Sequence, residues 1–320
     1  MRDLLIALAT LGLGAAHGER GRNALRPHHL LGNSTTHRSA KVRPAHRHVP
    51  LLVLIFSVKG NEARRDDQYR TWLTHPWRAA DGASIPWRYV YVLGRSRRAA
   101  ALEQPQDELV GDSVMLGRVE ETYLNLVHKT LASLRWAVAS VSFDVLLKTD
   151  DDSMLHVARL WAWLVSSPDA MPSPPAAPTS ASAEMLPPSA GATSVVPGVS
   201  DARRAGWLRL YAGRLQVNSQ VIRSNFSKAD LWHPAWFPDD FRKWAVPFSS
   251  FGAPKYPPHC SGGGYLLGKS AAEAILSQYT VWRGDVFPIE DAFLGVLATQ
   301  GGIRPTDMGG VPKVKQHREP

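Results

Sequence analysis

Three consecutive aspartates, Asp150, Asp151 and Asp152, end an apolar segment with the sequence DVLLKTDDD. Like charges this close resist ionising together, so their place at the end of a buried strand suggests a bound cation. Carboxylate oxygens suit hard cations such as Mn²⁺ and Mg²⁺. Because positions i and i+2 of a strand share a face, Asp150 and Asp152 can converge on one ion, while Asp151 points elsewhere or caps the next helix. Helix capping in a solvated loop, without a metal, is the alternative.

Three further motifs carry residues that could bind or react. The glycines of SGGGY (261–265) let a backbone approach a ligand closely, although a plain tight turn is the alternative. Two acids open IEDAFLG (289–295), where they cap a helix or supply a general base. RRDDQYRTW (64–72) either sends an arginine to a phosphate or forms a surface amphipathic helix.

Alternating strands and helices must position these motifs. The pattern predicts strands at 49–60, 87–94, 112–117, 143–149 and 207–217. It predicts helices at 62–73, 97–109, 120–140 and 154–167, a Gly-rich turn, strand and helix over 260–276, and a turn entering a helix over 287–302. Such alternation indicates an α/β fold with a mainly parallel sheet flanked by helices. Ligands bind these sheets outside the carboxyl ends of the strands, where the aspartates lie.

Composition divides the chain into three regions. Residues 1–16 contain a short apolar run after Met1-Arg2-Asp3, which predicts a signal peptide or a short signal anchor. Residues 17–49 are basic with almost no acid, which indicates a disordered stem. Residues 50–320 form the expected folded domain, with a Pro-, Ala- and Ser-rich low-complexity insertion at 168–203.

The bulk numbers agree with an ordinary globular domain. Hydrophobic residues make up 44% and charged residues 20% of the 320 residues. The net charge of +9 is concentrated in the stem rather than on the folded domain, so we expect no nucleic-acid partner. Cys260 is the single cysteine, so no intrachain disulfide can form.

Taken together and in order, the motifs resemble those of the β-1,3-glycosyltransferase family, which includes galactosyltransferases, N-acetylglucosaminyltransferases and the fringe enzymes. The resemblance covers roughly residues 51–300, and it is carried by RRDDQYRTW, EETYLNLVHKTL, LLKTDDDS, KYPPHCSGGGYLLG and IEDAFLG. It implies a GT-A fold, a Rossmann-like α/β architecture. It also implies a type II Golgi membrane protein with a lumenal catalytic domain, with the endoplasmic reticulum as the alternative, attached through the N-terminus if this is not cleaved.

The resemblance also assigns roles to residues. It implies Mn²⁺, with Mg²⁺ as the alternative, held by Asp150, Asp152 and His317, with Asp152 as the direct ligand. Asp291 is the implied catalytic base, and Glu290 is the second candidate. The implied set that binds the UDP-sugar comprises Arg65, Arg70, Lys148, Asp150, Asp151, Gly262, Gly263 and Gly264.

The implied reaction is an inverting transfer of a hexose, galactose first, from a UDP-sugar to a hydroxyl of a glycan acceptor on protein or lipid, in β-1,3 linkage. Transfer of N-acetylglucosamine or N-acetylgalactosamine and a catalytically silent glycan-binding relative remain alternatives. A metal-dependent phosphohydrolase would need further acidic or His ligands at other strand ends, and the sequence does not indicate them.

Overall fold

The computed structural model describes residues 48–96, 107–170, 199–231, 240–309 and 315–316. The chain divides into two units, residues 1–46 and 47–320, and the fold below is that of the second unit. The expected signal segment, almost all of the stem, most of the insertion and His317 lie outside the described residues. Among the helices that are described, none has the length and apolarity needed to cross a bilayer.

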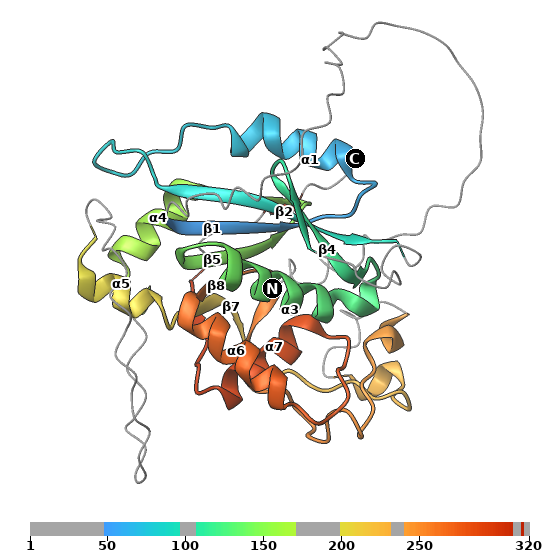
Figure 1. The fold of residues 1–320 in the computed structure, drawn as a ribbon. Helices are drawn as coiled ribbons and strands as arrows, with labels where there is room; N and C mark the ends of the chain where they lie inside the picture. Colours follow the sequence, from blue (N-terminus) through green and yellow to red (C-terminus); the bar gives the residue numbers. More distant parts are fainter. Residues whose placement is uncertain (1–47, 97–106, 171–198, 232–239, 310–314, 317–320) are drawn as a thin grey trace, which may run out of the picture. The chain divides into compact units, whose positions relative to one another are not determined.

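Within the described residues, eight strands form one mixed sheet in the order β3-β4-β2-β1-β5-β8-β7-β9 (Figure 1). Its parallel centre consists of β4 (Ser113–Glu120), β2 (Trp87–Arg95), β1 (Val49–Phe56) and β5 (Phe143–Asp150). The antiparallel strand β8 (His259–Gly268) joins β5 to β7 (Tyr211–Gln216), and β9 (Thr306–Asp307) runs parallel to β7. The short β3 (Glu108–Val110) lies antiparallel to β4 at the other edge.

Helices cover both faces of this sheet. Residues of β1 alternate between two cores, because successive side chains of a strand point to opposite faces: Leu52 and Leu54 join one core and Leu51 and Val53 the other. The first core contains α3 (Leu126–Ser140), α6 (Lys269–Val281) and α7 (Glu290–Gln300). The second contains α4 (Val157–Ser166), α5 (Asp201–Trp207) and the π-helical turn Tyr69–Leu73 that continues α1 (Glu62–Gln68) (Figure 1). The α/β architecture with a mainly parallel sheet flanked by helices is therefore confirmed.

Two predicted elements differ from the structure in the residues that it describes. The helix expected over 97–109 ends in described residues that form strand β3, because Glu108–Val110 pair with Ser113–Met115 of β4. The Gly-rich turn expected at the start of 260–276 is instead part of β8, where Gly264 pairs with Thr149 of β5. A glycine run has no side chains that reveal an alternation, so its extended conformation depends on pairing with both neighbouring strands.

Several boundaries also differ from the prediction. Helix α5 begins at Asp201, inside the range expected for the insertion, and the Ser200 hydroxyl caps it by accepting from the Arg203 N–H. Residues 153–154 form strand β6 instead of starting the next helix. Strand β6 pairs with β10 (Lys315–Gln316), which brings the C-terminal part of the chain beside the aspartates.

Candidate active site

Lys148 links the aspartates to β8, the strand that contains Gly262, Gly263 and Gly264. Its side chain is 2% exposed, and Nζ donates to Asp150 Oδ1 and to the carbonyl oxygen of Gly262, both at 2.8 Å. Burial alone would lower the pKa of Lys148, but Asp150 and Glu290 together raise this pKa above its usual value. The ammonium therefore remains charged at neutral pH and joins the end of β5 to β8.

The first turn of α7 meets the same glycine from the other side. Asp291 Oδ2 accepts a hydrogen bond from the Gly262 N–H at 2.8 Å, and Asp291 Oδ1 accepts from the Ala292 N–H at 2.9 Å. Gly262 thus contacts Lys148 through its carbonyl and Asp291 through its N–H. Three contacts of 2.8 Å connect Asp150 to Asp291, so two motifs that lie far apart in the sequence meet at the C-terminal end of strand β5.

The two acids of α7 have different surroundings. Glu290 is 4% exposed, and its Oε1 accepts from the Tyr265 hydroxyl at 2.6 Å and from the Thr130 hydroxyl at 2.8 Å. Burial raises the pKa of Glu290, Lys148 opposes this rise and Asp291 adds to it. Asp291 is only partly buried. Of the two candidates for a base, Asp291 is therefore the one that an incoming hydroxyl can reach.

Asp151 is directed towards the segment that follows β1. Its carboxylate accepts from the Ser57 hydroxyl at 2.7 Å, from the Asn61 amide at 2.8 Å and from Arg64 at 3.4 Å. Only 7% of Asp151 is exposed. His156, not Asp151, caps the following helix α4. Asp151 therefore joins the ends of β1 and β5. It does not cap the next helix, which was one of the two roles that the sequence left open for it.

Asp152 is the least paired of the three aspartates. In the described part of the chain its carboxylate accepts one long hydrogen bond, from the Ser153 hydroxyl at 3.4 Å. Burial raises the pKa of Asp152, and the charges of Asp150 and Asp151 raise it further. A cation at Asp152 would relieve this repulsion.

The residues present suit a hard cation that is shared with a ligand. No three Asp, Glu, His or Cys side chains converge on one point within the described residues. Mg²⁺ is commonly held by one or two carboxylates together with phosphate oxygens and water, and Mn²⁺ accepts the same oxygen ligands. Asp152 with Asp150 fits that pattern. His317 lies outside the described residues, although β10 pairs Gln316 with Ser153, next to Asp152.

The other predicted ligand-binding residues lie around this centre at different distances. Arg65 donates to the carbonyls of Val58 and Lys59 at 2.6 and 3.1 Å and to the Ser57 hydroxyl at 2.8 Å, so it braces the loop after β1. Arg70 is exposed on the π-helical turn and is not brought to the aspartates by any contact in the described chain.

The glycines of β8 differ in the space around them. A Cβ added at Gly263 would meet no atom within 4 Å. A Cβ at Gly262 would lie 3.4 Å from Glu290 Oε2 and 3.5 Å from Asp291 Oδ2. The strand backbone therefore passes close to both acids at Gly262, while Gly263 leaves one side open.

Sequence reasoning missed a second buried lysine. Lys129 of α3 is 3% exposed, and its Nζ donates to the Ser57 carbonyl at 2.7 Å and to both carboxylate oxygens of Glu121 at 2.8 Å. Glu121 in turn accepts from the Gly94 N–H at 2.6 Å, which ties β2 to the same group. Burial lowers the pKa of Lys129, and Glu121 opposes this. The only signal in the sequence was the spacing of Glu121 and Lys129 within one motif.

The described structure thus brings the aspartates that follow β5 and the acids that begin α7 together at one end of the central strands. Residues 63–176 and 209–309 match the galactosyltransferase family, so the chain belongs to this family and has its GT-A fold. Membership confirms the β-1,3-glycosyltransferase resemblance.

Named relatives include enzymes with two donor sugars. The chain is 27% identical to a dog protein named beta-1,3-galactosyltransferase 4, over 80% of this chain and 62% of that protein. It is 27% identical to a human protein named acetylgalactosaminyl-O-glycosyl-glycoprotein beta-1,3-N-acetylglucosaminyltransferase, over 83% of this chain and 56% of that protein. The chain thus spans less than two thirds of the length of these two relatives.

Proposed function

We propose that the protein is an inverting, metal-dependent transferase that moves galactose from UDP-galactose to a sugar hydroxyl of a glycan acceptor on protein or lipid, in β-1,3 linkage. The observation that carries the proposal is the path from Asp150 through Lys148 and Gly262 to Asp291. This path brings the carboxylates suited to a cation and the accessible acid Asp291 together at the C-terminal end of strand β5.

Each residue has a distinct part in the proposed reaction. Asp152 with Asp150 would hold Mn²⁺, or Mg²⁺ in its place, which when bound neutralises negative charge on a diphosphate leaving group. Asp291 accepts the proton of the acceptor hydroxyl, whose oxygen forms the new bond to the anomeric carbon. The bond from that carbon to UDP breaks on the opposite face, and UDP leaves with the electron pair. The configuration at the anomeric carbon is therefore inverted.

The buried charges would prepare the site for this step. Lys148 holds Asp150 at one carboxylate oxygen, and the Gly262 N–H fixes the orientation of Asp291. Fixed partners of this kind reduce the reorganisation that the reaction requires. Glu290, buried and bonded to Tyr265 and Thr130, has a positioning part at the start of α7.

A second donor is favoured by a specific observation. Named relatives include N-acetylglucosaminyltransferases at the same 27% identity as the galactosyltransferase. UDP-N-acetylglucosamine is therefore the second candidate, followed by UDP-N-acetylgalactosamine. We place the enzyme in the Golgi lumen, with the endoplasmic reticulum as the alternative, on the basis of the resemblance.

The test is UDP release by the purified full chain. UDP-galactose, UDP-N-acetylglucosamine and UDP-N-acetylgalactosamine are offered separately with a panel of acceptor sugars, with Mn²⁺ or with EDTA. Asp291→Asn should abolish release that depends on acceptor. Asp285→Asn is the matched control, because Asp285 is an exposed aspartate in the connection before α7.

The outcomes separate the alternatives. Metal-dependent release with one donor supports the proposal and identifies the sugar. UDP binding without turnover by any donor would support the silent glycan-binding relative instead. A folded protein that does not bind UDP would refute the transferase proposal.

A further inference from the structure

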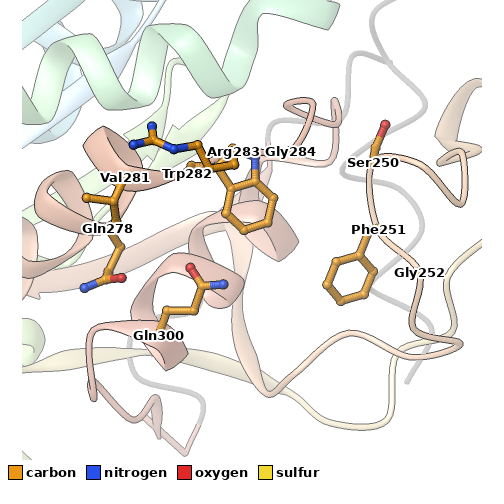
Figure 2. Close-up of a pocket in the computed structure, with 9 residues that line it drawn as sticks. All are labelled: Ser250, Phe251, Gly252, Gln278, Val281, Trp282, Arg283, Gly284 and Gln300. Atoms are coloured by element: carbon orange, nitrogen blue, oxygen red, sulfur yellow. The ribbon is translucent and has the colours of Figure 1, made fainter.

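A hollow of about 510 Å³ lies at the C-terminal ends of α6 and α7 (Figure 2). Trp282 and Phe251 present aromatic rings on opposite sides of it, and Gln278 and Gln300 project from the two helices. A volume of this size is in the range of small-ligand sites. No residue with a proposed part in catalysis lines the hollow.

The polar groups around the hollow are available for a ligand. Gln278, Arg283 and Gln300 make no side-chain hydrogen bond or ion pair within the described chain. Trp282 also lines the hollow, and its indole Nε1–H is buried without a hydrogen-bond partner among the described residues. A buried N–H group without a partner costs free energy unless a ligand or water satisfies it. Together these side chains offer donors and acceptors on several sides.

The aromatic rings are held by the core behind them. Phe251 stacks on Tyr256 with ring centroids 5.4 Å apart. Trp282 meets Phe293 of α7 edge to face at 5.3 Å. Because these contacts fix each ring, the surfaces that line the hollow are preformed, and a ligand would not have to order them.

The chemistry of the hollow matches a sugar. A pyranose ring has an apolar face of C–H groups that packs on aromatic rings, and a rim of hydroxyls that bond to amide and hydroxyl side chains. Of the lining residues Arg283 alone is charged, and no carboxylate lines the hollow. Two helices end here, and the partial negative charge of a helix C-terminus disfavours a phosphate. A neutral sugar therefore fits better than a nucleotide.

We infer that this hollow is a glycan subsite for sugars of the acceptor that lie away from the reacting hydroxyl. The inference rests on the proposed function for its choice of ligand. Gln300 is the last residue of α7 and Glu290 is the first. At 1.5 Å per residue the two ends of this helix are about 15 Å apart, so the subsite takes distal sugars and not the reacting one.

The experiment compares oligosaccharide binding by two double variants of the full chain. Gln278→Ala with Gln300→Ala removes both amides from the hollow. Glu273→Ala with Thr299→Ala is the matched control, because these exposed residues lie on the same helices outside the hollow. Calorimetry measures the affinity for N-acetyllactosamine as a disaccharide and as a tetrasaccharide, and thermal unfolding verifies that each variant is folded.

The subsite predicts that the Gln278 and Gln300 variant binds the tetrasaccharide about tenfold more weakly, as expected for loss of one or two hydrogen bonds, with unchanged affinity for the disaccharide. The control should match the native protein. Equal affinity of all three proteins for the tetrasaccharide, or no binding of it by the native protein, would overturn the inference. Because binding is measured without a donor, absent UDP release would refute the proposed reaction and leave this result to decide the subsite.

Discussion

Substitution of Gly295 by alanine should move the helix that carries Asp291 away from the sheet. Gly295 lies in the middle of α7, where the helix packs on β8. A Cβ at this position would lie 2.4 Å from the Cβ of His259 and 3.3 Å from its Cγ. Carbon atoms in contact are normally about 3.5–4.0 Å apart, so the two backbones must separate by about 1 Å.

The expected cost combines two opposing effects. Alanine favours a helix over glycine by about 1 kcal/mol. Forcing an extra methyl group into a packed core costs about 1–3 kcal/mol. Rotation of the His259 side chain cannot relieve this contact, because its Cβ is fixed by the backbone of β8 and the residue is only 4% exposed. The net loss is the packing cost minus the gain in helix propensity. Because His259 cannot yield, we expect the free energy of unfolding to fall by about 1–2 kcal/mol.

The same displacement should affect catalysis more than stability. Asp291 contacts the Gly262 N–H at 2.8 Å across the α7–β8 interface, and a shift of 1 Å is enough to break this contact. Misplacement on that scale can reduce kcat by about a hundredfold.

Urea unfolding and UDP release measure the two effects of the Gly295 substitution. Gly60→Ala is the control, because a Cβ at Gly60 meets no atom within 4 Å. A Gly295→Ala protein with native stability and native kcat would show that α7 does not rest on His259 as described.

Three further perturbations test the charges of the site. Lys129→Met should lower the free energy of unfolding by about 3 kcal/mol, because it leaves Glu121 without its cation. Adding Glu121→Gln should recover part of this loss in urea unfolding, and additive losses in the double variant would contradict the pairing. Asp152→Asn should weaken Mn²⁺ binding in calorimetry by more than the roughly tenfold effect typical of a supporting residue, whereas Asp151→Asn should mainly lower stability. Burial raises the pKa of Glu290, so its contribution to stability is complete below its ordinary pKa of 4.5 and is lost as pH rises through the higher pKa of the folded state. Glu290→Gln does not titrate and should therefore gain stability relative to the native protein between acid and neutral pH. An unchanged difference between pH 4 and 7 would contradict that sign.

The strands that position the site were predictable because their signal is local. The apolar run of β1 is buried on both faces, as expected for a central parallel strand, and its start at Val49 was predicted, although the strand ends at Phe56 and not at residue 60. The meeting of Asp150 with the start of α7 was anticipated only through the resemblance to a family. The contact itself depends on Gly262, which the sequence alone presents equally well as part of a turn.

The buried charges could not be predicted, because each depends on a partner far along the chain. Lys129 bonds to the carbonyl of Ser57, 72 residues earlier. Glu290 is distinguished from Asp291 by the hydroxyl of Thr130, 160 residues away. Both acids follow Ile289 at the start of one helix, and no local pattern indicates which of them the core covers.

The distribution of partners explains how the chain tolerates three adjacent carboxylates. Asp150 is paired with the ammonium of Lys148, and Asp151 accepts hydrogen bonds from two neutral donors and forms an ion pair with Arg64. Asp152 has no direct ion pair among the described residues, and burial and these two neighbours raise its pKa although the charge of Arg64 opposes the rise. Asp150 and Asp151 thus have direct cationic partners, and Asp152 is the carboxylate at which a bound cation would relieve the most repulsion. If a cation binds there, its affinity should depend on Asp152 more than on Asp150, because Lys148 already competes for the oxygen of Asp150.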